Sequence, residues 1–178
     1  GIDFARKSCA CTPAFDDDLD EELADFELEY DILVIAPGCA PNTFGTPGVA
    51  EHAVFMKNVS DARRVRKVLF DLLEKASLPK TAPARVDELL HVAIVGGGPT
   101  GIEMAAELDD LAKRELRDLY PEVGHRLHIS IYDVAPNILG AYDRKLHEYA
   151  HQRLRSREVR IETSSQIERV ERGAMWIR

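Results

Sequence analysis

Short apolar runs recur along the chain and predict the strands of an α/β fold. Residues 32–36, 91–95 and 127–132 are rich in Val, Ile and Leu, and residues 159–162 form a fourth, shorter run. The run at 32–36 is wholly apolar and is bounded by turn-forming residues, which is typical of a strand buried on both faces of a parallel sheet. We also expect a short pair of strands near the C-terminus.

Between these runs, the apolar residues are spaced as on one face of a helix. Residues 60–76, 99–119 and 143–155 show this spacing, and Ser60 is expected to cap the first of the three helices. Residues 78–85 contain two prolines and are expected to form a linker. Because strands alternate with helices, the fold class is predicted to be α/β, with a doubly wound parallel sheet and right-handed crossovers.

A glycine-rich turn lies between the run at 91–95 and the helix at 99–119, and it is the most informative feature of the chain. Gly96, Gly98 and Gly101 have G-x-G-x-x-G spacing, the Rossmann-type signature that places a dinucleotide pyrophosphate against a helix N-terminus. A tight turn that merely packs is the alternative. The residues assigned to the pyrophosphate are Gly96, Gly97, Gly98, Pro99, Thr100 and Gly101.

Two acids extend this hypothesis. Asp133 follows the strand at 127–132, where a dinucleotide fold places the carboxylate that binds the adenosine ribose. An anion there would repel a 2′-phosphate and therefore favours NADH over NADPH, whereas a turn-capping aspartate is the alternative. Glu103 lies in the first turn of the glycine-loop helix, where it faces the nicotinamide end or simply pairs with the helix dipole.

Charge and cysteine content narrow the function classes. The net charge is −8, no Lys or Arg occurs between Ser8 and Met56, and no basic face indicates nucleic-acid binding. The acidic run at 16–22 is expected at the tip of a hairpin formed by residues 1–30, because it lacks the spacing of a calcium loop. Three cysteines without a C-x-x-C pair are typical of a reducing, intracellular compartment and predict neither a redox disulfide nor a metal site.

Four segments together resemble one family, the type II or alternative NADH:quinone oxidoreductases of the two-dinucleotide-domain flavoproteins. These segments are residues 30–49, 61–79, 95–108 and 138–146. The resemblance implies that FAD binds a first Rossmann domain and that a second, inserted domain presents NADH to it. Hydride would pass from NADH to the flavin and then to a quinone, in a respiratory-chain enzyme that attaches to a membrane face without pumping protons.

The resemblance also assigns roles to residues. Gly96, Gly98 and Gly101 match the NADH loop, Asp133 matches the ribose acid, and Glu103 matches the acid near the nicotinamide. On the FAD side, the matching stretch is Ala36, Pro37 and Gly38. No residue of the chain is assigned to catalysis.

The same resemblance predicts that the chain is part of a larger protein. Residues 1–42 would contribute strands to the FAD-binding domain and residues 43–178 would form the NADH-binding domain, because only one G-x-G-x-x-G is present. We expect this fragment to bind NADH weakly without turnover. The parent would be peripheral to the inner mitochondrial or bacterial plasma membrane, with a homodimer left open. The alternatives are a ferredoxin, rubredoxin or disulfide reductase and a non-catalytic NADH-sensing module.

Overall fold

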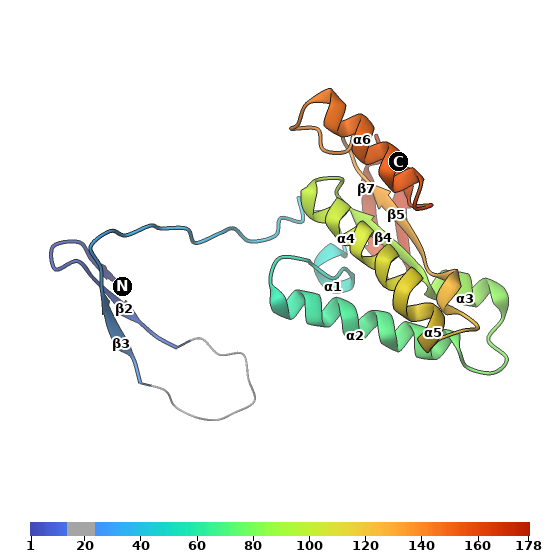
Figure 1. Cartoon of the computed structure of the whole chain (residues 1–178), viewed down its shortest axis with the longest axis horizontal. Helices are drawn as coiled ribbons and strands as arrows, with labels where there is room; N and C mark the ends of the chain where they lie inside the picture. The colour runs from blue at the N-terminus through green and yellow to red at the C-terminus, as the bar shows by residue number, and fades with distance from the viewer. Residues whose placement is uncertain (14–23) are drawn as a thin grey trace. The chain divides into compact units, whose positions relative to one another are not determined.

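The computed structural model of this chain describes residues 1–13 and 24–178. Three parallel strands form the centre of the larger part of the structure. The strands are β4 (His91–Val95), β5 (His128–Tyr132) and β6 (Arg160–Glu162), and they lie in the order β4-β5-β6 (Figure 1). The parallel α/β sheet predicted from the sequence is therefore confirmed. These strands belong to a compact unit, Ala40–Arg178, which is distinct from a smaller unit, Gly1–Cys39.

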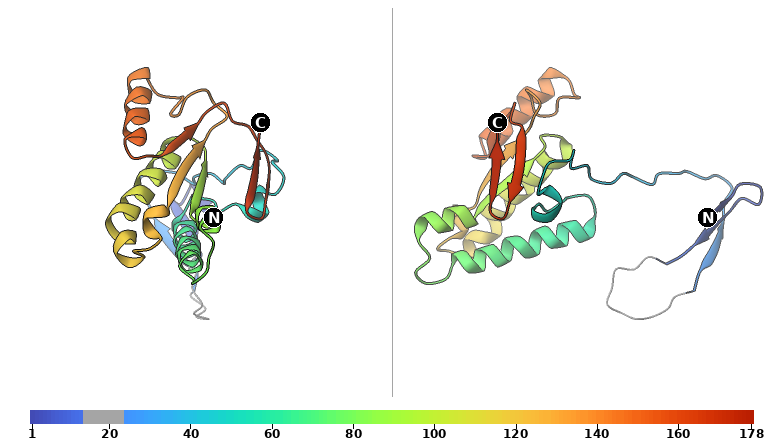
Figure 2. Two further views of the ribbon diagram at one scale, coloured as in Figure 1. Left: turned by 90° about the vertical axis from the view of Figure 1, so that its right-hand side faces the viewer. Right: turned by 180° about the vertical axis from the view of Figure 1, so that it is seen from behind.

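Helices connect and cover these strands, as Figure 2 shows from two further directions. In chain order they are α1 (Val49–His52), α2 (Val59–Ala76), α3 (Pro83–Leu89), α4 (Pro99–Leu111), the π-helix η1 (Ala112–Leu116), α5 (Arg117–Leu119), the 3₁₀-helix η2 (Gly124–Arg126) and α6 (Arg144–Arg155). The predicted long helix over 99–119 thus corresponds to α4, η1 and α5. The predicted linker at 78–85 is wrong in its second part, because Pro83 begins α3 in the first-turn position that proline favours.

The beginning of α2 differs from the sequence-based expectation. Asn58, not Ser60, is the N-cap, because its side chain accepts a hydrogen bond from the Asp61 N–H. The Asp61 carboxylate in turn accepts the Asn58 N–H, which completes a capping box. Ser60 instead donates to the Asn58 side chain. The reciprocal pair at positions 58 and 61 satisfies two backbone donors and decides the helix start.

The core of the larger unit lies between the sheet and its helices. Its side chains come from α2, α3, α4, η1, β5, the loop that follows β5, and α6, so the core joins elements far apart in the sequence. The largest fully buried side chains are Leu73, Leu90, Leu116, Ile131 and Ile138. Burial of an aliphatic side chain of this size stabilises the folded state by about 1.5–3 kcal/mol.

The predicted pair of strands near the C-terminus is confirmed. Strands β7 (Ile167–Glu171) and β8 (Ala174–Ile177) form an antiparallel hairpin. The hairpin is joined to the segment before α1, because the Val170 N–H donates to the Pro47 carbonyl at 2.9 Å. Among the helices within 1–13 and 24–178, none has the length and apolar character that crossing a membrane requires.

The smaller unit is an antiparallel meander of β1 (Ile2–Asp3), β2 (Ser8–Cys11) and β3 (Phe26–Glu29). Strands β2 and β3 confirm the hairpin expected within residues 1–30. The acidic tip predicted at 16–22 lies outside the described residues.

The strand predicted at residues 32–36 is wrong in this structure. The segment is not part of any described sheet, and Ile32, Val34 and Ile35 are exposed. A buried parallel strand needs a neighbour on at least one side and cover on both faces. The described residues of Gly1–Cys39 provide only the small meander, so the local apolar pattern has no sheet to join.

We predict that His91 makes folding stability fall as the pH is lowered. Its ring stacks on His128, with ring centroids 4.4 Å apart, and its Nε2 lies 2.9 Å from the Ser130 hydroxyl. Partial desolvation of its ring, followed by the charges of His128 and Arg160, lowers the pKa of His91 below the usual histidine value of 6.5. The unfolded chain therefore binds a proton more readily, so stability is retained above pH 6.5 and declines as the pH falls through that value toward the folded pKa.

The measurement is urea unfolding at pH 7.5 and pH 5.5 for the wild type and His91→Gln, which retains a polar partner for Ser130. The wild type should lose more stability across this interval than the variant. An equal loss in both proteins would show that another group controls the pH dependence.

Candidate functional site

The glycine loop turns the chain sharply from β4 into α4. Gly96 extends the sheet by one residue, since its N–H donates to the Tyr132 carbonyl at 2.8 Å. Its φ of 114° is a backbone conformation that side chains with a Cβ rarely adopt. Gly98 then lies in an extended conformation as the N-cap of α4, and Pro99 occupies the first helical turn. The strand–turn–helix context predicted for G-x-G-x-x-G is present.

The second and third glycines of the motif meet different surroundings. A Cβ on Gly101 would lie 2.0 Å from the Gly96 carbonyl oxygen, so only glycine lets α4 pack this closely on the end of β4. A Cβ on Gly98 would meet no atom within 4 Å. The requirement for glycine at position 98 therefore does not come from packing within the chain, and it is consistent with close approach of a ligand to the backbone.

The N-terminus of α4 offers donors to that ligand. The first N–H groups of a helix have no partner within the helix, and Gly98 provides no side-chain cap. The helix dipole adds a partial positive charge at the same end. Backbone donors and dipole together favour a phosphate beside Gly98, Thr100 and Gly101.

Asp133 lies beside this loop, although it is 36 residues from Gly97 in the sequence. Its Oδ2 accepts the Gly97 N–H at 2.5 Å, and its Oδ1 accepts the Ala135 N–H at 2.7 Å. The second contact is the turn-capping role that the sequence left open. Each carboxylate oxygen has a second lone pair, so Asp133 can hold the turn and still accept a hydrogen bond from a hydroxyl group of a ligand.

Ile138 and Leu139 are part of the site, although the sequence assigned them no role. The Leu139 N–H donates to the Gly97 carbonyl at 2.7 Å. Ile138 is fully buried, and its Cγ2 would lie 2.7 Å from a Cβ placed on Gly97. The signal available in the sequence was Gly97, the middle glycine of the run 96–98, because the G-x-G-x-x-G motif does not require glycine at that position.

The other predicted site residues are less closely connected to the loop. Glu103 is on α4 and is exposed, which suits either interpretation of its role. Ala36, Pro37 and Gly38 lie in the smaller unit and are exposed, with Gly38 in the left-handed region at φ 72°. Their assignment to the FAD side stays a prediction.

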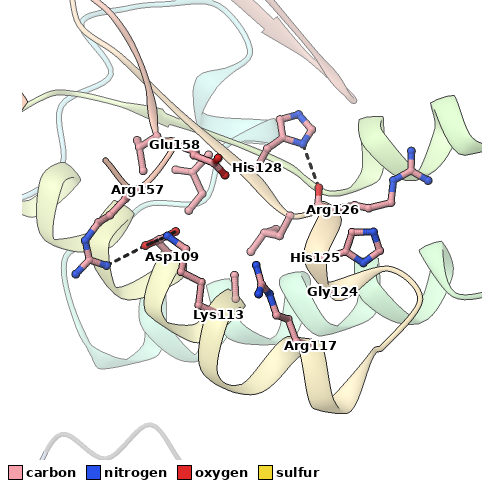
Figure 3. A pocket seen from close by; sticks show the side chains of 13 residues that line it. Asp109, Lys113, Arg117, Gly124, His125, Arg126, His128, Arg157 and Glu158 are labelled. Carbon is pink, nitrogen blue, oxygen red and sulfur yellow. Dashed lines mark hydrogen bonds and ion pairs between the residues drawn. The ribbon is translucent and has the colours of Figure 1, made fainter. Parts of the chain in front are cut away.

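A separate cavity lies where the strands begin, between η1, η2, the start of β5 and the loop after α6 (Figure 3). Within it, the nearly buried Asp109 pairs with Lys113 at 2.8 Å and with Arg157 at 2.9 Å. Arg157 also bonds Asp110, which lowers the pKa of that carboxyl. These ion pairs tie α4 to the loop after α6, so we assign the cluster a structural role. No group of side chains suited to a metal occurs among residues 1–13 and 24–178.

Comparisons with known proteins agree with this geometry. The family model described as pyridine nucleotide-disulphide oxidoreductase matches residues 1–175. The external alternative NAD(P)H-ubiquinone oxidoreductase B1, mitochondrial, of Arabidopsis thaliana is 38% identical over 166 residues, which are 93% of this chain and 29% of that protein. The external alternative NADH-ubiquinone oxidoreductase, mitochondrial, of Yarrowia lipolytica is 33% identical over 174 residues, 98% of this chain and 30% of that protein.

A solved structure is similar as well. NDH2 from Plasmodium falciparum in complex with NADH has a TM-score of 0.77 and 30% identity, covering 99% of this chain and 34% of that one. The chain therefore spans about a third of the length of these three proteins.

We predict that the motif glycines affect stability unequally. Gly101→Ala would force a methyl group onto the Gly96 carbonyl and should cost at least about 1–3 kcal/mol of unfolding free energy, as overpacking does. Gly98→Ala should change it by less than about 0.5 kcal/mol, because its Cβ points into open space. Urea denaturation followed by circular dichroism measures both. Equal destabilisation by the two substitutions would contradict the packing role of Gly101.

Proposed function

Because the chain belongs to the pyridine nucleotide-disulphide oxidoreductase family, we propose that it is the NADH-binding part of a flavin-dependent NADH:quinone oxidoreductase. The observation that carries the proposal is the hydrogen bond between Asp133 and Gly97. It brings the predicted ribose acid to the predicted pyrophosphate loop, at the end of adjacent parallel strands. Ligands of open α/β sheets bind at this end.

Different residues of the chain would bind different parts of NADH. Amides at Gly98, Thr100 and Gly101 would bind the pyrophosphate with the help of the α4 dipole. Asp133 would accept a hydrogen bond from a ribose hydroxyl and repel a 2′-phosphate. Glu103, exposed on α4, would lie toward the nicotinamide. Cofactors of this class carry the hydride chemistry themselves, so these side chains would orient NADH rather than catalyse its oxidation.

The flavin side of the proposal rests on fewer residues. When bound to the longer protein, FAD would supply the redox chemistry between NADH and the quinone. Among the residues that the structure describes, only Ala36, Pro37 and Gly38 are candidates to lie beside FAD, and a left-handed glycine such as Gly38 permits close backbone approach. Three small residues are too few to hold FAD, so we derive no step of flavin chemistry from this structure and expect no turnover by this chain alone.

The acceptor and the cellular location follow from the relatives. The names of the plant and yeast proteins specify ubiquinone and mitochondria. We extend quinone reduction and attachment to the inner mitochondrial membrane, or to a bacterial plasma membrane, to the longer protein that would contain this chain. A homodimer of that protein stays a prediction. No two of Cys9, Cys11 and Cys39 have the C-x-x-C spacing of a redox pair, which favours the quinone-reducing branch over the disulfide-reducing branch.

The first test is whether the purified 178-residue chain binds NADH. Nicotinamide fluorescence should change and saturate on titration, with a dissociation constant below about 1 mM, equivalent to about −4 kcal/mol. The same titration with Gly98→Ala should show at least tenfold weaker binding at unchanged stability, because the added methyl group would occupy the space of the pyrophosphate. No fluorescence change with the wild type at millimolar NADH would refute the proposed function.

The second test concerns the choice between NADH and NADPH. Asp133→Asn removes the negative charge but keeps an oxygen that can accept the Gly97 N–H. The ratio of the NADPH and NADH dissociation constants should fall about tenfold, which corresponds to ~1.4 kcal/mol. Separate fluorescence titrations with NADH and with NADPH give the two dissociation constants and hence their ratio. Asp143→Asn, at the N-cap of α6, is the matched control and should leave the ratio unchanged.

A further inference from the structure

The N–H and the carbonyl of Gly97 are both hydrogen-bonded to residues outside the glycine motif. Asp133 accepts its N–H at 2.5 Å, and Leu139 donates to its carbonyl at 2.7 Å. A hydrogen bond at each end fixes the rotation of this part of the loop about its own axis. The Gly97 N–H therefore faces Asp133, and the open side of Gly98 is left to the ligand.

A buried side chain completes this restraint. Ile138 has no exposed surface, and a Cβ on Gly97 would lie 2.7 Å from its Cγ2 and 2.9 Å from Asp133 Oδ2. A Cβ atom does not approach other heavy atoms this closely, so Ile138 and Asp133 leave room only for glycine. The buried segment around Ile138 therefore restricts the conformations that the glycine loop can adopt on this side.

Leu139 adopts an unusual backbone conformation at this contact. Its φ is 54°, a left-handed value that costs a non-glycine residue energy. The conformation is stabilised because the Leu139 side chain is buried and its carbonyl accepts the Tyr142 N–H at 2.8 Å. Gly140 follows directly, yet the strained position is taken by leucine. Strain maintained beside a candidate binding loop points to a role in shaping that loop.

We propose that Ile138 and Leu139 are positioning residues for NADH: they hold the Gly97 peptide so that the glycine loop has its binding shape before the cofactor arrives. This inference rests on the proposed function and adds two residues to it. A loop that is already ordered loses less conformational entropy on binding, so the bound state is favoured without any additional contact to the ligand.

The test is a set of dissociation constants for NADH measured on the full 178-residue chain at a temperature well below each unfolding transition. Ile138→Ala removes the Cγ2 that faces Gly97 and should weaken binding at least about fivefold. Ile138→Val retains that methyl group and should bind within about twofold of the wild type. Leu73→Ala, on α2, is the control: Leu73 is also fully buried, and its loss should lower the unfolding temperature without changing the dissociation constant.

A double-mutant cycle supplies the decisive comparison. Gly97→Ala should weaken NADH binding at least about tenfold, because its methyl group meets Ile138 and Asp133. In the double variant Gly97→Ala/Ile138→Ala, the new methyl group can occupy the vacated space, so binding should be tighter than in Gly97→Ala alone. Simple addition of the two losses, or an effect of Leu73→Ala equal to that of Ile138→Ala, would overturn the positioning role.

The two proposals fail in different ways. If the wild-type chain binds no NADH, the proposed function fails. If the wild type binds NADH but Ile138→Ala does not weaken it, only the positioning role fails.

Discussion

The close approach of α4 to the end of β4 is the constraint on which the candidate site depends. A Cβ on Gly101 would lie 2.0 Å from the Gly96 carbonyl oxygen, so this helix can start where it does only without a side chain at that position. Once α4 starts there, its N-terminal amides and dipole lie at the end of the sheet. The hydrogen bond from Gly96 to Tyr132 then holds the loop next to β5, and Asp133 follows Tyr132 directly.

Much of this arrangement could be predicted from the sequence because its causes are local. A strand, a turn and a helix follow one another within about a dozen residues, and each motif glycine has a reason that can be read from spacing: a tight turn, close approach of a ligand, or helix packing. Asp133 could be placed because parallel neighbouring strands end at the same edge of a sheet. Its second role, as an acceptor for the Ala135 N–H, was also among the alternatives that the sequence allowed.

The sequence-based predictions are wrong or incomplete where distant residues, or competing hydrogen-bond partners, determine the structure. Residues 32–36 have the pattern of a buried strand, but a pattern does not supply the neighbouring strands that such a strand must pair with. Ser60 and Asn58 are both good N-caps, and the choice depends on the reciprocal bond that Asp61 makes with Asn58. The contact of Ile138 with Gly97 spans 41 positions and has no repeating pattern, so no rule of spacing could have identified it.

These long-range contacts bear directly on the binding role that we propose for the loop. Three consecutive glycines would leave a backbone with many accessible conformations, and fixing one residue costs roughly 1–2 kcal/mol of conformational entropy. In this fold, the loop is ordered when the protein folds, because Asp133, Ile138 and Leu139 restrain Gly97. Ile138 and Leu139 belong to the same core that packs β5. Glycine provides the space for a ligand next to the backbone, and buried residues elsewhere in the chain remove the flexibility that glycine would otherwise bring.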